Sequence, residues 1–306
     1  MELDVLNLMF MPNGSSERQH TLAAPVKVSG IGLHTGVQTN LVLRPAPANT
    51  GIVFKRTDLD GFVIRARAGN VTHVSYATSL MSKGVLVSTT EHLLSALGAL
   101  GVDNAYAEMD NIEVPIMDGS ALPFAREIIH AGLRRQRARR DFIRILKPVE
   151  ISDGNKRLAV YPSETFRISC SIEFAHPLIR NQAVEFSQCS GDYLGEIAPA
   201  RTFGFLEEAE KLRQAGLVRG GSLENAVVLS EDAVLNPEGL RFPDEFVRHK
   251  LLDLIGDLML LGHPLTGHVV AHRAGHAMHY ALVSRLLEEK SAWRLAGPAP
   301  VRTSAA

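Results

Sequence analysis

The sequence predicts an α+β fold built from two similar domains that arose by internal duplication. In both halves, short stretches with strand-like patterns precede one helical stretch, and residues 37–45 alternate with a period of two. The helical stretch of each half carries a central histidine, His92 or His249, and a further strand follows it. This self-similarity indicates duplication of one α+β unit, with the two equivalent helices facing each other.

Composition places the chain among ordinary globular proteins and excludes several classes. Its 306 residues are 45% hydrophobic and 21% charged. The net charge of −1 lacks the strong positive charge that nucleic-acid binding needs. Cys170 and Cys189 lie in no metal-binding spacing, so we expect two buried thiols in the reducing cytoplasm. No apolar run approaches the roughly 18 residues of a transmembrane segment. We expect a monomer.

The predicted organisation is a leader, two domains and a tail. Residues 1–20 are expected to be a flexible leader because they end in a polar, turn-rich stretch. The domains span residues 21–136 and 141–295, and residues 296–306 have a disordered composition. The basic run from Arg134 to Asp141 favours a solvated linker over a nucleic-acid site, because the remainder of the chain is neutral.

In the first domain, strand patterns are followed by a helix, a strand and a second helix. The strand patterns cover residues 22–29, 37–45, 51–59, 62–68 and 103–109, and the second helix covers residues 121–133. The first helix follows a cap at Ser88 or a nearby threonine, and its buried stripe is expected to comprise Leu93, Leu94, Leu97 and Leu100.

The second domain repeats this order. Strands are expected at residues 142–151, 156–163, 166–174 and 225–230. Helices are expected at residues 206–215, in the segment that holds His249 and Asp253, and at residues 273–289. The middle helix of these three has an apolar stripe suited to burial, formed by Leu251, Leu252, Ile255 and Leu258.

His249 and Asp253 are candidate metal ligands. A spacing of four residues puts them on one face of the predicted helix, one turn apart. Two ligands do not make a stable zinc site, and if the duplicated helices face each other, His92 supplies the third. Two nitrogens and one oxygen leave a fourth position for water, which is typical of a catalytic zinc ion.

Glu91 is the candidate general base because it adjoins His92. A structural alternative exists for it. Ser88 and Glu91 match a capping box, in which the glutamate satisfies a backbone N–H group of its own helix.

His276 is the candidate general acid, at the start of the last helix. The partial positive charge of a helix N-terminus disfavours a protonated histidine, so a compensating carboxylate is needed, and Asp257 is the candidate. His272 and His276 form an alternative metal pair, which is disfavoured because Gly275 interrupts the helix that would align them.

Four further residues are candidates for contacts with substrate. Thr202 can donate its hydroxyl to a developing oxyanion, and Lys250 and Arg273 offer positive charge to an anionic part of the substrate. Either cation is also compatible with a solvated surface position. His34, in the turn GIGLHTG, is either a turn residue or a polar group that lines a cleft.

Several motifs together resemble one enzyme family, the UDP-3-O-acyl-N-acetylglucosamine deacetylases of lipid A biosynthesis. They are SGIGLHTG, TTEHLLSALGALGVDN, EVPIMDGSALPF, ARTFGF, GLRFPDEFVRHKLLDLIGDL and AGHA, in the order and spacing of that family from about Thr21 to about Trp293. The resemblance implies two similar domains, each a β-sheet with two helices, with the helices sandwiched between the sheets.

The resemblance also assigns roles to residues. It implies zinc ligands at His92, His249 and Asp253, a general base at Glu91, a proton donor at His276, an orienting carboxylate at Asp257 and a carbonyl-polarising residue at Thr202. It implies substrate contacts at Lys250 and Phe203, and an acyl-chain passage around residues 205–226 lined by Leu217 and Val218. Arg273 and Glu208 stand where the family often has lysine and aspartate.

The implied activity is zinc-dependent removal of the acetyl group from an acylated UDP-N-acetylglucosamine. Glu91 takes a proton from the attacking water and His276 gives one to the departing amine. Fe²⁺ suits the same ligands as Zn²⁺. Two alternative functions are compatible with the same predicted metal ligands. One is a non-catalytic sugar-nucleotide binding protein with a structural metal, and the other is an amidohydrolase for another acylated amino sugar.

Overall fold

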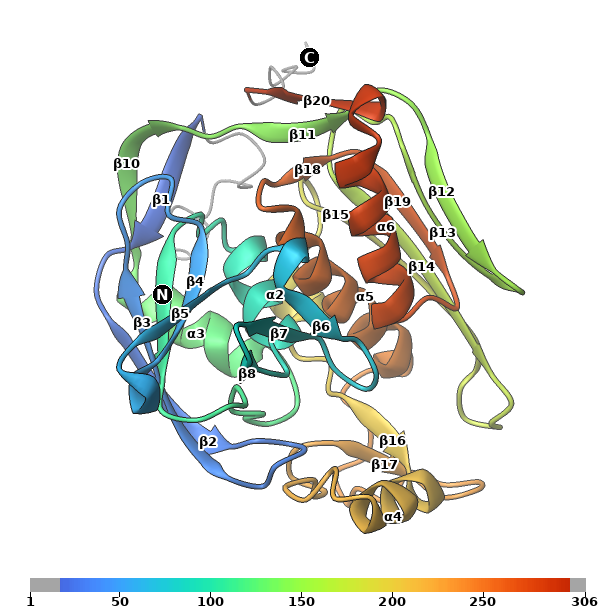
Figure 1. Ribbon diagram of the computed structural model, residues 1–306. Helices are drawn as coiled ribbons and strands as arrows, with labels where there is room; N and C mark the ends of the chain where they lie inside the picture. Colours follow the sequence, from blue (N-terminus) through green and yellow to red (C-terminus); the bar gives the residue numbers. More distant parts are fainter. Residues whose placement is uncertain (1–16, 298–306) are drawn as a thin grey trace, which may run out of the picture.

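Two five-stranded β-sheets enclose a layer of helices (Figure 1), in a computed structural model that describes residues 17–297. The first sheet has the order β2-β3-β9-β4-β5, with strands at Val26–Ile31, Gln38–Pro45, Ala105–Met109, Ile52–Arg56 and Phe62–Arg65. The second has the order β12-β13-β19-β14-β15, with strands at Val149–Asp153, Lys156–Tyr161, His268–His272, Arg167–Phe174 and Arg180–Ser187.

The two sheets share one topology. In the first, β9 pairs antiparallel with β3 and parallel with β4, and in the second, β19 pairs antiparallel with β13 and parallel with β14. Helix α2 precedes β9 and α3 follows it, just as α5 precedes β19 and α6 follows it. The predicted α+β class is confirmed, and the repeated topology is compatible with the predicted duplication.

The four helices between the sheets are α2, α3, α5 and α6. They span Glu91–Ala99, Leu122–Ala131, Glu245–Leu258 and His276–Glu288. Both predicted apolar stripes are buried, that of α2 and that of α5. Burial of α2 and α5 extends around nearly their whole circumference, so most of their polar residues are buried as well. Any charge on these two helices therefore needs a partner inside the protein.

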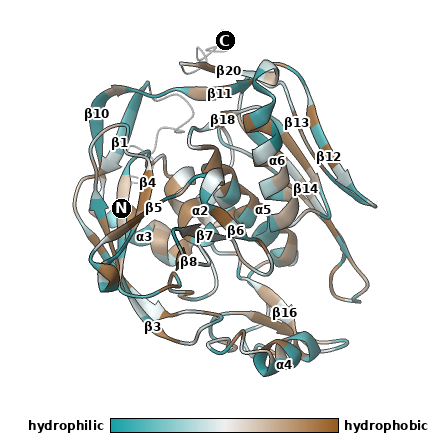
Figure 2. Ribbon diagram, viewed as in Figure 1, coloured by the Kyte–Doolittle hydropathy of each residue, from teal (hydrophilic) through white to brown (hydrophobic). Residues whose placement is uncertain are grey.

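Each half carries a smaller β-unit besides its five-stranded sheet. Strands β6 (Val71–His73), β7 (Ser79–Ser82) and β8 (Val85–Val87) form an antiparallel sheet between β5 and α2. In the second half, β16 (Phe203–Phe205) and β17 (Val227–Leu229) pair in parallel around α4 (Leu206–Gln214). Helix α4 has no buried residue and is largely hydrophilic (Figure 2).

The predicted linker is wrong. Residues Leu133–Arg139 form strand β10, which pairs antiparallel with β1 (Arg18–Leu22), and the guanidinium of Arg140 is buried against Asp103. Strand β1 also begins inside the predicted leader, and residues 1–16 lie outside the described residues. Strand β10 pairs with β1 because its backbone N–H and C=O groups need hydrogen-bond partners. The charged side chains do not prevent this pairing, since they are largely exposed.

A three-stranded sheet completes the second half. It has the order β18-β11-β20, with strands at Leu265–Thr266, Phe142–Ile145 and Trp293–Ala296. Strand β20 therefore includes Ala296, the first residue of the predicted tail, and residues 298–306 lie outside the described residues. The domain boundaries themselves stay a prediction.

Both cysteines are free thiols. Cys170 is buried as predicted, whereas Cys189 is exposed and corrects that part of the prediction, because it lies in the loop after β15 rather than in a strand. None of the helices at residues 17–297 combines the length and the apolar character needed to cross a bilayer.

Helices α2 and α5 approach each other closely at Gly256. A Cβ atom at this position would overlap the backbone carbonyl of Glu91. Gly98 in α2 also faces the opposing segment, but there a Cβ atom would meet the side chain of Met259. Backbone cannot move aside without separating the helices, whereas a flexible thioether can.

We expect Gly256→Ala to lower the free energy of unfolding by about 1–3 kcal/mol, because overpacking forces the two helices apart. The measurement is chemical denaturation at equilibrium. The matched control is Gly98→Ala, a helical glycine with a movable neighbour, which should change stability much less. Equal effects of the two substitutions would contradict the proposed close approach.

Candidate metal centre and catalytic site

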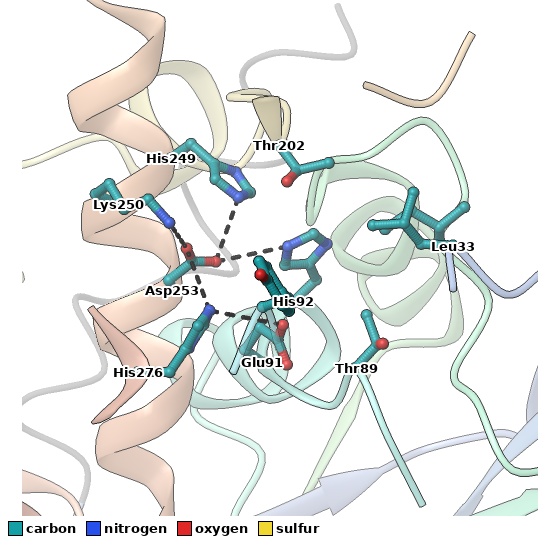
Figure 3. Close-up of a pocket in the computed structure, with 11 residues that line it drawn as sticks. Leu33, Thr89, Glu91, His92, Thr202, His249, Lys250, Asp253 and His276 are labelled. Atoms are coloured by element: carbon teal, nitrogen blue, oxygen red, sulfur yellow. Dashed lines mark hydrogen bonds and ion pairs between the residues drawn. The ribbon is translucent and has the colours of Figure 1, made fainter. Parts of the chain in front are cut away.

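Helices α2 and α5 bring the three predicted metal ligands together. His92 is the second residue of α2, and His249 and Asp253 lie one turn apart on α5. The Nε2 atoms of His92 and His249 lie 3.5 Å and 3.3 Å from Asp253 Oδ1, and the two rings are nearly perpendicular at 88°. All three side chains are buried, and both imidazoles point at the carboxylate (Figure 3).

The chemistry of these atoms fits a bound cation. Asp253 Oδ1 is buried and has no hydrogen-bond donor. His249 Nδ1 donates to the backbone oxygen of Ala200 at 3.1 Å, and burial lowers the pKa of His249 to about 3. Nε2 of His249 therefore carries a lone pair that faces the carboxylate oxygen. Two electron-rich atoms turned toward each other in a buried site favour a positive ion between them.

Lys250 provides the permanent positive charge beside this group. Its Nζ lies 3.0 Å from the second carboxylate oxygen, Asp253 Oδ2. Burial alone would raise the pKa of the Asp253 carboxyl, but the neighbouring Lys250 ammonium helps to hold it well below its usual range. Asp253 is therefore ionised, as a metal ligand must be.

Glu91 begins α2 beside His92, and its carboxylate is buried. Its Oε2 accepts a hydrogen bond from the backbone N–H of Thr78 at 3.0 Å. The capping-box alternative is wrong, because Thr90 is the N-cap residue and no side chain caps the helix. Burial raises the pKa of Glu91, so this carboxylate accepts a proton more readily than an exposed one.

His276 is the first residue of α6, and its ring is held by Asp257. The His276 Nδ1 atom lies 2.7 Å from Asp257 Oδ2, while Nε2 lies 3.9 Å from Glu91 Oε1 (Figure 3). Burial alone would lower the pKa of His276, but the Asp257 carboxylate raises it to about 9. His276 is therefore a protonated histidine at neutral pH, and its Nε2 faces Glu91 Oε1 and Asp253 Oδ2. His272 ends β19 and contacts Ser171 instead, so it forms no metal pair with His276.

Two residues around Asp257 were not predicted. His279 Nδ1 lies 2.7 Å from Asp257 Oδ2, and Thr78 donates its hydroxyl to Asp257 Oδ1 at 2.6 Å. Asp257, His276 and His279 are also close enough to hold a metal ion. At these distances, however, each Nδ1 carries a proton shared with the carboxylate. The spacing of His276 and His279 was a usable signal. Thr78 lies 179 residues from Asp257 and left no signal in the sequence.

A pocket gathers most of the predicted catalytic residues. Its lining comprises Leu33, Tyr76, Thr89, Glu91, His92, Ile116, Thr202, His249, Lys250, Asp253 and His276. The ring of Phe203 lies just behind, 6.4 Å from the ring of His249 and 5.6 Å from Lys250 Nζ. Leu33, Tyr76, Thr89 and Ile116 were missed, because loop residues carry no periodic pattern.

Two buried carboxylates hold loops around this pocket. Glu113 accepts hydrogen bonds from the backbone N–H groups of His34 and Thr35 and from the hydroxyl of Thr89, at 2.8–2.9 Å. These bonds tie the turn that carries Leu33 to the start of α2. Glu245, at the start of α5, pairs with Arg201 at 2.9 Å and so anchors the segment that carries Thr202.

Besides Phe203, four predicted substrate contacts do not line the pocket. Arg273 pairs with Glu173 at 2.8 Å, and its contact with substrate stays a prediction. His34 is partly buried, but the neighbouring Leu33 takes the lining position. Leu217 and Val218 follow α4, and backbone bonds join the next two residues to the Leu33–His34 turn.

Comparison with known proteins identifies close relatives. Residues 19–288 match the family described as UDP-3-O-acyl N-acetylglycosamine deacetylase (LpxC). A protein of Solibacter usitatus named UDP-3-O-acyl-N-acetylglucosamine deacetylase is 52% identical over 275 residues, covering 90% of this chain and 93% of the relative. Proteins of the same name from Myxococcus xanthus and Phenylobacterium zucineum are both 50% identical, covering 92% and 90% of this chain and 90% and 96% of their own lengths.

We expect His249→Ala to reduce bound metal from about one ion per chain to nearly none, because it leaves only two ligands. The measurement is elemental analysis of the purified protein by mass spectrometry. His272→Ala is the matched control and should keep the ion. Loss of the ion from His279→Ala, together with its retention in His249→Ala, would instead place the metal at Asp257.

Proposed function

The chain belongs to the LpxC family, and we propose on this basis that it hydrolyses the acetamide of UDP-3-O-acyl-N-acetylglucosamine. The products are acetate and UDP-3-O-acyl-glucosamine, in the biosynthesis of lipid A. The observation that supports this reaction best is the meeting of His92, His249 and Asp253 beside Glu91 and His276 in one pocket. Metal-assisted amide hydrolysis uses these three elements together, a Lewis acid, a base and an acid.

Zn²⁺ is the ion we propose for His92, His249 and Asp253. Two imidazole nitrogens and one carboxylate oxygen are a donor set that zinc accepts, with one position left open. When bound, the ion supplies a Lewis acid that makes water more acidic and polarises a carbonyl oxygen. Fe²⁺ suits the same donors and is the alternative.

Glu91 is the proposed general base. Its raised pKa matches a carboxylate that must accept a proton near neutral pH. The backbone N–H of Thr78 engages only Oε2. Oε1 is therefore left to take the proton from the water that attacks the acetyl carbon.

Thr202 and Lys250 are the proposed substrate-binding groups at the reacting carbonyl. Thr202 lines the pocket, and its backbone is held on both sides, by Gly119 and by Val227. A hydroxyl fixed in this way can donate to the oxyanion without reorganising. Lys250 lines the same pocket, and its Nζ lies 5.6 Å from the ring of Phe203.

His276 is the proposed proton donor to the leaving nitrogen. Its Nδ1–H bond to Asp257 directs the second nitrogen, Nε2, toward Glu91 and Asp253. As the C–N bond breaks, the glucosamine nitrogen takes the Nε2 proton, so that it leaves as a neutral amine.

The acyl chain is proposed to leave the pocket past Leu33. A Cβ atom on Gly221 would contact the side chains of both Val218 and Leu33, so the loop after α4 meets the pocket edge there. Leu217 and Val218 offer apolar surface along this path. We also propose a cytoplasmic location, which the two free thiols support.

We expect Glu91→Gln to lower the rate of acetate release by about 100-fold or more, because the amide cannot accept the proton. The assay measures acetate from the acylated UDP-sugar, together with metal content. Glu127→Gln, an exposed position on α3, is the control and should behave as wild type. Full turnover by Glu91→Gln at normal metal content would refute the base assignment.

The pH dependence of kcat/KM should show a limb that falls as the pH rises through about 9, the raised pKa of His276. The sign follows from the role: the protonated form is the active one, and it is lost above this pKa. His276→Gln should be slower by about 100-fold or more and should lack this limb. A variant that keeps the same alkaline limb would assign it to another group.

A further inference from the structure

Thr78 contacts both halves of the acid–base machinery. Its backbone N–H donates to Glu91 Oε2 at 3.0 Å, and its hydroxyl donates to Asp257 Oδ1 at 2.6 Å. The same hydroxyl oxygen lies 3.2 Å from His276 Nδ1. Thr78 is 1% exposed, so water does not compete for these contacts.

Counting protons determines what this hydroxyl does. Asp257 cannot donate, because its neighbours hold its pKa at about 2 against the effect of burial. The single hydroxyl proton of Thr78 therefore goes to Asp257, and the oxygen presents a lone pair to His276 Nδ1. His276 Nδ1 then faces two acceptors, the Thr78 hydroxyl oxygen and Asp257 Oδ2, and carries a proton. These contacts hold the ring in the orientation in which Nε2 faces the pocket.

The backbone of Thr78 is itself held in place. Its carbonyl oxygen accepts hydrogen bonds from the backbone N–H and the hydroxyl of Thr90, at 3.2 Å and 3.1 Å. Thr90 is the N-cap residue of α2, which carries Glu91 and His92. Thr78 is thus fastened to one helix through its backbone and to Asp257 of another through its side chain.

We propose that Thr78 is a positioning residue for the deacetylation. Its hydroxyl holds the Asp257–His276 pair and its N–H group holds Glu91, so that Thr78 fixes the position of the pair relative to Glu91. This inference rests on the proposed function. Thr78 does not line the pocket, so it should act on the proton-transfer step rather than on substrate binding.

The test is Thr78→Val, which keeps the shape and the backbone N–H but removes the hydroxyl. We expect kcat to fall by about 10- to 100-fold, as is usual when an outer partner of a metal-site residue is lost. KM and metal content should stay near wild type. Thr78→Ser restores the hydroxyl and should recover most of kcat.

Thr39→Val is the matched control. Thr39 is also fully buried, but its hydroxyl has no hydrogen-bond partner among the described residues. Its replacement also removes one buried hydroxyl but leaves the contacts of Glu91, Asp257 and His276 unchanged. The kcat of this variant should therefore equal that of wild type.

Wild-type kcat in Thr78→Val would overturn the inference, as would Thr78→Ser being as slow as Thr78→Val. If Thr78→Val does not fold, Thr78→Ser and Thr78→Ala are compared, and equal kcat values would overturn it. Wild-type protein is assayed in the same series. Absence of acetate release there would overturn the proposed function and this inference together, whereas active wild type with active Thr78→Val overturns this inference alone.

Discussion

The contact between α2 and α5 is the constraint on which the pocket depends. Glu91 and His92 come from one helix, and His249 and Asp253 from the other, so their distances are set by how closely the helices pack. The absence of a side chain at Gly256 allows that approach. Because protein interiors are close-packed, the apolar stripes on both helices hold the spacing rigidly. Misplacement by about 1 Å is enough to impair a catalytic site.

Three buried carboxylates, Asp253, Asp257 and Glu91, lie around the pocket, and the negative charge of each is compensated in a different way. Asp253 faces two imidazoles and the ammonium of Lys250, whereas Asp257 accepts three hydrogen bonds from neighbouring side chains. Glu91 has one backbone donor and a raised pKa. Unequal compensation moves the pKa values of like groups apart, and this suits the three residues to their proposed roles as a metal ligand, an orienting group and a base.

The sequence predicted those parts of the structure that rest on local pattern. The apolar stripes of α2 and α5 follow from helical periodicity, and His249 and Asp253 share a face because they are four residues apart. Predictions from residue type alone were less secure. Most of the basic run at 134–141 lies in the paired strand β10, and Arg273 forms an ion pair with Glu173. Charge in a sequence does not say which backbone or side chain will meet it.

The sequence by itself determined the fold class, the buried helices and the candidate ligands, because periodicity and fixed spacing act over a few residues. Only the tertiary structure decided that Glu91 is not a cap, that Leu33 and not His34 borders the pocket, and that Thr78 and His279 surround Asp257. These are contacts between segments far apart in the chain or details of loop geometry. Their physical basis is the packing of whole elements, to which no local pattern in the chain corresponds.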